Sequence, residues 1–341
     1  MDLSLIQKSL LIVGFFGGIV LISFLAVYYL WPSVLIRVGI WYKRKKNGVK
    51  IKYAKCKDYT FCYICRGNPG PQPSMLLLHG FTASKDMWLE LFKGFPKDLH
   101  VVCIDMPGHG DTTRLEGESY TGVDQVARIH QFVECVGLNR KPFHLVGISM
   151  GGMVAGLYAA YHPSEVHCLS LFCPAGLQSP TPSEYMKHMK DMKSQEKSSA
   201  ENNPLIPSSL EQAKDLIKLG IYQSPPKLDT QLIKGYLDYQ RPHNAFYKKC
   251  FADISSEESR FLLHDNLTKI KAPMQVIWGK DDKIIDPSGA EVFAAAFPSS
   301  QIYILERCGH FIVGDRPRKS IKLLLEFNNS FCNPAESKKM A

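Results

Sequence analysis

Short apolar runs alternate with longer amphipathic segments along most of the chain. The runs at 76–78, 101–104, 143–146, 168–173, 274–278 and 301–305 have the length expected of strands buried in a sheet. Segments with helical periodicity separate them, and an antiparallel pair of strands is expected over 49–66. This alternation predicts an α/β fold, a mostly parallel sheet flanked by helices, with the functional site at the carboxyl ends of the strands.

One insertion, over 177–271, breaks the alternation. It is rich in Ser, Pro, Met, Lys and Tyr, and it contains amphipathic pieces at 183–193 and 210–222. Its position after the sixth strand favours a helical cap that closes over the site. A surface insertion with no part in the site would have the same pattern.

The beginning of the chain is apolar over a much longer distance. No charged residue occurs from Ser9 to Ile36, a span long enough to cross a hydrocarbon core of about 30 Å. A secretory signal would have a shorter apolar region ending in small residues, whereas this one ends in Tyr28, Tyr29 and Trp31. We therefore expect a retained signal-anchor helix. The expected parts are an anchor with a basic juxtamembrane segment at 1–48, a catalytic α/β domain at 49–333 and a disordered tail at 334–341.

The formal net charge of +9 has a local origin. Nine Lys and Arg residues and no acidic residue lie between Arg37 and Lys57, so the rest of the chain is close to neutral. A basic cluster directly after a spanning helix, with Trp41 and Tyr42 inside it, indicates an interfacial anchor on anionic lipid and not a nucleic-acid-binding protein. The positive-inside rule then predicts a single-pass membrane protein with a cytosolic C-terminal domain. Late endosome or lysosome, mitochondrion and endoplasmic reticulum all remain open as the membrane.

The ten cysteines have no spacing typical of a disulfide framework, which agrees with a cytosolic domain. Cys62 and Cys65 form a C-x-x-C pair. An odd separation on a strand directs two side chains to opposite faces, which argues against a shared metal ion. The glycosylation sequons at Asn266 and Asn328 would remain unused in the cytosol.

Ser149 is the centre of a G-x-S-x-G pentapeptide, residues 147–151, between an apolar run and a stretch rich in small residues. A strand that leads directly into a helix needs a sharp turn, and glycines two positions on either side of the serine allow close backbone approach. Such a turn presents the Ser149 hydroxyl at the top of the sheet, where a base can reach it. We therefore expect Ser149 to be a catalytic nucleophile.

A serine hydroxyl is a weak nucleophile at neutral pH. It needs a histidine base oriented by a carboxylate, in the chain order Ser, Asp or Glu, His. His310 lies just past the end of the last expected strand and is the candidate base. Asp281 and Asp282 both leave the loop after the preceding strand, and spacing alone does not separate them. Asp286 is expected to be a turn or helix-cap residue.

The oxyanion formed in acyl transfer needs two backbone N–H donors. Met150, directly after the candidate nucleophile, is expected to supply one. Phe81, which follows His79 and Gly80 at the end of an apolar strand, is the expected second donor. His79 is interpreted as a structural support for this turn, and the loop at 105–110 as part of the pocket rim.

These motifs together resemble those of the α/β-hydrolase superfamily over residues 50–333. Five signatures occur in the family's order: the turn at 79–81, the loop at 105–110, the serine pentapeptide at 147–151, the acid loop at 278–282 and Cys308-Gly309-His310. Within the superfamily the chain is similar to membrane-anchored monoacylglycerol lipases. That narrower match rests on the segments 31–33, 85–88, 141–147, 173–178 and 316–319.

The resemblance implies hydrolysis of a single-chain glycerolipid ester, monoacylglycerol with lysophospholipid as a further substrate, through an acyl-enzyme on Ser149. The family pattern places the acid at the fifth position counted from Trp278, which selects Asp282 to orient His310. It implies no metal, no organic cofactor and no required protein partner. Phe311, directly after the base, is bulkier than the pattern leads one to expect, which bears on acyl-chain preference.

Two other functions remain open on the sequence. His100 and Asp105 form an H-x-x-x-x-D pattern, as in some acyltransferases, but the strand at 101–104 would hold them at opposite ends. The second is a membrane-anchored interaction protein with a catalytically silent serine. An epoxide hydrolase or dehalogenase is disfavoured, because it would need a carboxylate where Ser149 stands.

Overall fold

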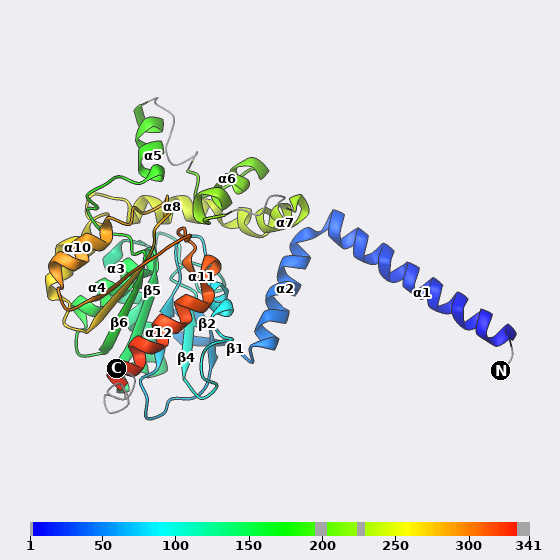
Figure 1. The fold of residues 1–341 in the computed structure, drawn as a ribbon, viewed down its shortest axis with the longest axis horizontal. Helices are drawn as coiled ribbons and strands as arrows, with labels where there is room; N and C mark the ends of the chain where they lie inside the picture. Colours follow the sequence, from blue (N-terminus) through cyan, green and yellow to red (C-terminus); the bar gives the residue numbers. More distant parts are fainter. Residues whose placement is uncertain (1–2, 195–202, 224–228, 333–341) are drawn as a thin grey trace.

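The computed structural model describes residues 3–194, 203–223 and 229–332, so the expected disordered tail at 334–341 lies outside the described residues. Eight strands form one sheet in the order β1-β2-β4-β3-β5-β6-β7-β8 (Figure 1). β2 runs antiparallel to β1 and β4, and the other neighbouring strands are parallel. The predicted α/β fold with a mostly parallel sheet is confirmed.

The strands coincide with the apolar runs, with small differences at their ends. They are β1 Lys50–Cys56, β2 Tyr59–Arg66, β3 Met75–Leu78, β4 Val101–Ile104, β5 Phe143–Ile148, β6 Val166–Phe172, β7 Met274–Gly279 and β8 Gln301–Leu305. Every residue of β3, β4, β5 and β7 is buried. Their continuous apolar sequences reflect this position, because helices cover both faces of a parallel sheet.

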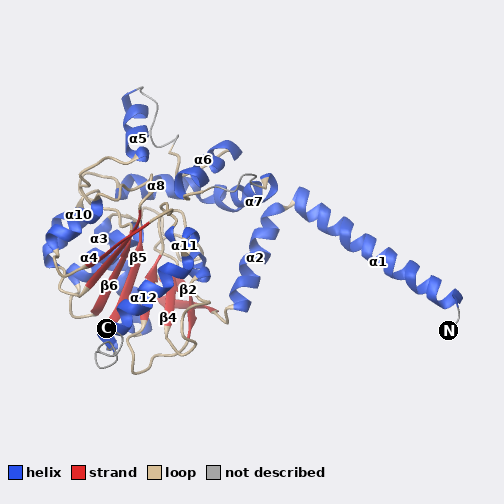
Figure 2. Cartoon of the chain, viewed as in Figure 1, coloured by secondary structure: helices blue, strands red, loops and turns tan. Residues whose placement is uncertain are grey.

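Helices lie on both faces of the sheet, with α12 on one face and α3 and α4 on the other (Figures 1 and 2). The α3 helix begins after Thr121, whose side chain accepts a hydrogen bond from the Asp124 N–H, and ends at Gly137 with φ 68°. The helices of the α/β domain are α3 Gly122–Val136, α4 Met150–Tyr161, α9 Leu262–Asn266, α10 Gly289–Ala296, α11 Ile312–Asp315 and α12 Pro317–Cys332, and the short 3₁₀ helices are η1 Lys85–Glu90, η2 Leu138–Arg140 and η4 Leu267–Lys269.

A buried polar chain fixes α12 to the sheet. His144 on β5 contacts Asn328 on α12 through Nδ1 at 3.0 Å and Ser170 on β6 through Nε2 at 2.7 Å. Gln275 on β7 donates to the same Ser170 hydroxyl at 2.7 Å. Burial lowers the pKa of His144 to about 4, so the ring is neutral and serves packing.

The expected cap is present as a helical layer over the carboxyl ends of the strands (Figure 2). Ala213, Ile233 and Leu237 form a small apolar cluster separate from the main core, so part of the cap packs on itself. The cap helices are α5 Glu184–Ser194, α6 Leu210–Gly220, α7 Thr230–Gln240, η3 Arg241–His243 and α8 Asn244–Ile254.

The N-terminal helix α1, Leu3–Leu30, projects away from the rest of the molecule (Figure 1). Its segment Ile6–Leu30 has 25 residues and a mean hydropathy of 2.8, and none of its most apolar window is buried. At 1.5 Å per residue this segment is about 38 Å long, enough to cross a membrane. The expected run from Ser9 to Ile36 is nevertheless not one helix. Trp31 leaves the helical conformation, with φ −134° and ψ 57°, because the proline at the first position of α2, Pro32–Lys46, disfavours helix in the residue before it.

Five of the nine basic residues lie on α2, and two of these five form ion pairs with the catalytic domain. The Arg44 guanidinium pairs with the Asp86 carboxylate, and the Lys43 ammonium lies 2.6 Å from Glu90 Oε1. Both acidic residues belong to η1, which follows the expected oxyanion turn. Part of the basic cluster thus forms ion pairs within the protein.

The same helix packs against the cap. A Cβ atom on Gly235 of α7 would lie 2.6 Å from the Pro32 carbonyl oxygen, so only glycine allows this approach. The Arg37 guanidinium lies over the Tyr239 ring at 5.6 Å. Thus α2 contacts both η1 and α7, and it connects the anchor to two sides of the site region.

The cysteines depart from expectation in one respect, because Cys56 at the end of β1 and Cys135 on α3 form a disulfide with a Cα–Cα distance of 6.0 Å. The two residues are separated by 79 positions, so no local spacing signature marks them. The side chains of Cys62, Asp105 and Asp111 form a group of potential metal ligands. Cys65 does not belong to any such group of potential ligands among the described residues.

Candidate active site

Ser149 occupies a strained turn between β5 and α4. Its φ of 56° and ψ of −120° lie outside the regions that non-glycine residues favour. A Cβ on Gly147 would lie 2.2 Å from the Gly151 carbonyl oxygen, and one on Gly151 would lie 2.4 Å from the carbonyl oxygens of Leu78 and His79. Glycine is therefore required on both sides, as the pentapeptide predicts, and the turn holds the serine at the carboxyl end of the sheet.

Asp282 and His310 meet next to this turn. His310 Nδ1 lies 2.8 Å from Asp282 Oδ2, and the two side chains are 6% and 0% exposed, respectively. Asp282 Oδ1 accepts hydrogen bonds from the Ile284 and Ile285 N–H groups, both at 2.9 Å. With both carboxylate oxygens engaged, the orientation of His310 is fixed.

The structure distinguishes the roles of Asp281 and Asp282, which sequence spacing alone could not separate. Asp281 is exposed, and its carboxylate accepts a hydrogen bond from the Cys308 N–H at 3.3 Å. Asp281 therefore supports the loop that carries His310 without contacting the imidazole. Asp286 accepts from the Ser288 N–H at 3.0 Å, as a turn residue does.

The turn at 79–81 lies beside the serine, since a Cβ on Gly80 would be 3.3 Å from the Ser149 Cβ. His79 Nε2 accepts a hydrogen bond from the Met106 N–H at 2.9 Å, so the ring proton is on Nδ1, which donates to the Gly80 carbonyl at 2.7 Å. Burial lowers the pKa of His79 to about 3, which keeps this arrangement neutral. His79 is thus placed to support the turn. The Phe81 N–H donates to no acceptor in the described part of the chain.

Met150 is the first residue of α4, where backbone N–H groups have no partner within the helix. Phe81 and Met150 therefore offer two backbone donors on neighbouring elements near Ser149. Such a pair is suited to stabilise negative charge that develops on a carbonyl oxygen.

The structure contains a buried ion pair close to the turn at 79–81, and the sequence did not predict it. Lys85 Nζ lies 2.6 Å from Asp105 Oδ2, and the Lys85 N–H donates to Asp105 Oδ1 at 2.8 Å. Both side chains are almost fully buried. The segment after Phe81 is thereby tied to the 105–110 loop. Lys85 and Asp105 both belong to motifs identified in the sequence, but a buried ion pair between them depends on the tertiary fold.

Ser149 and His310 line one cavity, and residues of both the α/β domain and the cap form its walls. Its volume is about 60 Å³. The apolar walls include Phe81, Met87, Ile148, Leu205, Leu216 and Ile284.

Asp315 is another residue near the site whose role the sequence did not predict. Its Oδ2 accepts from the Gly309 N–H at 2.7 Å and from the Tyr222 N–H at 2.9 Å, so it joins the loop of the candidate base to the cap. Phe311 adds to this junction, because its N–H donates to the Gly220 carbonyl at 2.8 Å and its ring fills the space where a Gly220 side chain would stand. Phe311 also lines the cavity, consistent with an influence on chain preference.

The alternative acyltransferase pair is not brought together. His100 precedes β4 and contacts the Ser74 hydroxyl at 2.8 Å, whereas Asp105 follows β4 and binds Lys85. The two residues lie at opposite ends of the strand, as the sequence predicted.

Comparisons with known proteins agree with this geometry. The profile of the alpha/beta hydrolase fold matches residues 73–317. The chain is 48% identical over 340 residues to monoacylglycerol lipase ABHD6 of Rattus norvegicus and to that of Homo sapiens, and each match covers 100% of both chains. Among solved structures, a membrane phospholipase A described as a bacterial virulence factor superposes with a TM-score of 0.80 at 30% identity, over 94% of this chain and 99% of that one.

The serine turn, the acid loop and the histidine loop thus stand at the carboxyl ends of a parallel sheet, within a chain that the family profile matches over most of its length. The relatives also confirm the narrower resemblance inferred from the sequence. The chain therefore belongs to the alpha/beta hydrolase fold family.

Proposed function

We propose that this protein is a serine hydrolase that cleaves the ester bond of monoacylglycerols, releasing a fatty acid and glycerol. The observation that carries the proposal is that Ser149 and His310 line the same mainly apolar cavity. The two curated relatives at 48% identity, both named monoacylglycerol lipases, support the choice of substrate.

In the proposed reaction His310 accepts the hydroxyl proton of Ser149 as the serine oxygen attacks the ester carbonyl carbon. The backbone N–H groups of Phe81 and Met150 stabilise the oxyanion, and Asp282 stabilises the imidazolium. His310 then gives its proton to the glycerol oxygen, the ester bond breaks and an acyl-enzyme remains. Water, deprotonated by His310, attacks the acyl-enzyme and releases the fatty acid.

The test of this function is a substrate panel on the full-length protein in detergent. Glycerol and fatty acid should be released in equal amounts from monoacylglycerol, because one ester bond is cleaved per turnover. Lysophospholipid is the second substrate to include, since the structural neighbour at 30% identity is named a phospholipase A. Faster transfer of the acyl group to an added lipid alcohol than to water would instead favour the acyltransferase alternative.

We also propose that α1 is a single membrane-spanning anchor that leaves the catalytic domain in the cytosol. Support comes from the apolar segment Ile6–Leu30 and from the nine positive charges between Arg37 and Lys57 that follow it. Anionic lipid is the proposed partner of the basic residues that remain exposed. The Cys56–Cys135 disulfide argues against a cytosolic location, because disulfides are rare in cytosolic proteins.

The orientation predicts that protease added to intact microsomes digests a C-terminal tag. Cys56 and Cys135 should also be alkylated in cells without prior reduction. A protected tag together with an intact disulfide would place the domain in the lumen. Asn266 and Asn328 are both buried, so a glycan on either residue would conflict with this fold.

Charge substitutions refine the same test. Lys45 and Lys46 lie over the rings of Trp41 and Tyr42 and form no ion pair within the part of the chain that the structure describes, so replacing both by Glu should disturb the orientation and leave activity in detergent near normal. Arg44→Glu is the contrasting variant. It also breaks the ion pair with Asp86, and we expect it to lower stability even in detergent.

A further inference from the structure

Gln240, the last residue of the cap helix α7, contacts the backbone of the turn that carries Phe81. Its Nε2 donates a hydrogen bond to the Thr82 carbonyl oxygen at 2.9 Å, and its Oε1 accepts one from the Tyr247 hydroxyl on α8 at 3.0 Å. Both side chains belong to buried residues. Because a carbonyl oxygen can only accept a hydrogen bond, the amide nitrogen of Gln240 has to face Thr82, which leaves Oε1 for the tyrosine. Two cap helices thus reach the candidate active site through one buried amide.

Residues 80–83 form a β-turn, closed by a hydrogen bond from the Ala83 N–H to the Gly80 carbonyl oxygen at 3.2 Å. Thr82 is the third residue of this turn and has a φ of 58°, a conformation that β-branched residues rarely adopt. Such a residue keeps this conformation only where its surroundings hold it there. Gln240 supplies one of the contacts that do so, because it binds the Thr82 carbonyl.

The planarity of the peptide bond transmits this contact to the expected oxyanion donor. In a trans peptide the carbonyl oxygen and the N–H point in opposite directions. The Thr82 carbonyl, held by Gln240, therefore sets the direction of the Ala83 N–H. The Ala83 N–H donates to the Gly80 carbonyl, which in the same way sets the direction of the Phe81 N–H.

We propose that Gln240 is a positioning residue for the oxyanion donor at Phe81, and that the Tyr247 hydroxyl holds Gln240 in place. The proposal rests on the serine-hydrolase function proposed above. His79 binds the Gly80 carbonyl as well, at 2.7 Å. The Phe81 N–H is thus directed by one side chain of the α/β domain and by one side chain of the cap, which gives the cap a part in the reaction beyond forming a wall of the cavity.

Tyr247 contacts the same turn through its ring. The centroid of the Phe81 ring lies 5.9 Å from that of Tyr247 and 5.7 Å from that of Phe251. Burial raises the pKa of Tyr247, so the hydroxyl keeps the proton that it donates to Gln240. A Tyr247→Phe substitution removes this hydrogen bond and keeps the ring contacts, so it separates the two roles.

The main test is Gln240→Met in the full-length protein in detergent, because methionine has a similar length and offers no N–H. We expect kcat with monoacylglycerol to fall about 10- to 100-fold, less than the roughly 10²- to 10³-fold cost of removing an oxyanion-hole donor outright. KM should change by less than about threefold, because the lost interaction acts on the transition state. Initial rates over a range of substrate concentrations separate the two constants.

The rate of labelling by a fluorophosphonate should fall in the same proportion. In that reaction the Ser149 oxygen bonds to phosphorus, fluoride leaves, and the serine proton passes to His310. The phosphoryl oxygen takes the position of the oxyanion. This measurement does not depend on which ester the enzyme prefers. Labelling of the unsubstituted protein without hydrolysis of monoacylglycerol would therefore reject the proposed substrate, while the comparison with Gln240→Met would still test the positioning role.

Gln231→Met is the matched control for Gln240→Met. It makes the same substitution at the other end of α7, about 14 Å away along the helix. Gln231 Oε1 has no hydrogen-bond partner within the described part of the chain. This variant should hydrolyse ester and react with the probe at nearly the normal rate.

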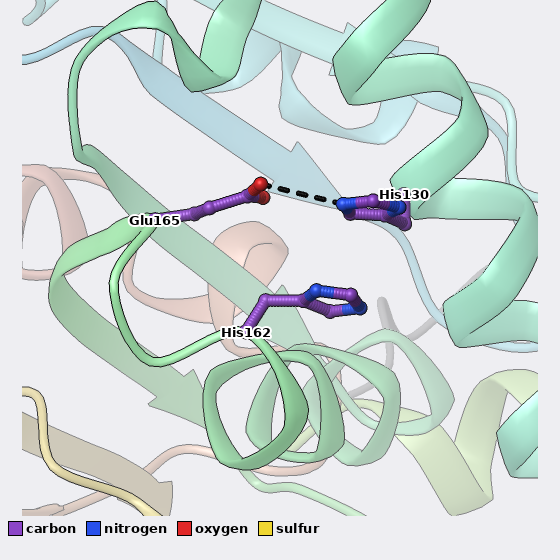
Figure 3. A group of neighbouring side chains, drawn as sticks. All are labelled: His130, His162 and Glu165. Atoms are coloured by element: carbon purple, nitrogen blue, oxygen red, sulfur yellow. Dashed lines mark hydrogen bonds and ion pairs between the residues drawn. The ribbon is translucent and has the colours of Figure 1, made fainter.

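A control for Tyr247→Phe comes from the end of α4 that is remote from the serine turn. Figure 3 shows the Glu165 carboxylate there, directed towards His130, and the Tyr158 hydroxyl donates to the same carboxylate. The His162 ring stacks on that of His130, with centroids 3.9 Å apart, so the group is closely packed. Because α4 has 12 residues, it lies about 18 Å along the helix from the serine. Tyr158→Phe therefore removes a buried tyrosine hydroxyl far from the oxyanion turn, and labelling should stay near normal.

Tyr247→Phe should lower the labelling rate less than Gln240→Met does, by about three- to tenfold, and should add nothing in the double variant, because both changes act through one contact. This variant loses a single oxygen atom, so it keeps the proposal testable if Gln240→Met folds poorly. The proposal is overturned if Gln240→Met keeps its full labelling rate, if Gln231→Met loses as much, if the loss appears in KM alone, or if the two losses add.

Discussion

Ser149→Ala should abolish ester hydrolysis and labelling by a fluorophosphonate probe. We expect turnover to fall by at least about a thousandfold, because loss of the nucleophile in serine hydrolases costs several orders of magnitude. The fold should survive, since alanine differs from serine only by the missing hydroxyl and keeps the backbone of the turn. Initial rates with monoacylglycerol and the melting temperature measure the two effects.

A matched control for this variant is Ser74→Ala. Ser74 lies just before β3, at the opposite end of the sheet, and its hydroxyl contacts His100. This variant should hydrolyse ester at nearly the normal rate. If Ser149→Ala retained activity within about tenfold of the unsubstituted protein, the proposed triad would be wrong, whichever substrate is used.

Asp282→Asn should have the second largest effect, and Asp281→Asn a small one. In Asp282→Asn the amide oxygen can still accept from Ile284 and Ile285, but the amide nitrogen then faces His310 Nδ1. This favours the imidazole tautomer with its proton on Nε2, which cannot accept the proton of Ser149. The corresponding change in a serine protease lowers kcat by about 10⁴, and we expect a loss of that order.

Asp281→Asn is the natural control, because an asparagine oxygen can still accept the Cys308 N–H and no contact with His310 is lost. The two variants should have similar melting temperatures and differ mainly in kcat. Equal activities, or a larger loss in Asp281→Asn, would contradict the assignment of Asp282 as the residue that orients the base.

Much of the fold was predictable, because the information is local. Parallel strands that are buried on both faces favour continuous, mainly apolar runs, and the runs that became β3, β4, β5 and β7 show this without reference to one another. The glycines around Ser149 also carry a local signal, since the turn requires them. The family pattern separated Asp282 from Asp281, and the structure places Asp282 beside His310.

The remaining features depend on segments that are distant in sequence. Asp315 joins Gly309 to Tyr222, and neither partner could be inferred from its neighbours along the chain. The same holds for Cys56 and Cys135, and for the pairing of Arg44 with Asp86. The absence of charge from Ser9 to Ile36 also does not indicate where the helix in this segment breaks. At Trp31 the local rule for residues before proline outweighs the hydropathy pattern.

The position of α2 bears on how a detergent-free form of this enzyme should be prepared. Deleting everything before residue 48 would remove the apolar helix α1 but also leave Asp86 without its cationic partner and uncover the α7 surface at Gly235. A truncation at Trp31 would remove the apolar helix α1 and keep both contacts. The useful boundary of the water-soluble enzyme therefore lies at the bend between the two helices, upstream of the basic cluster and not after it.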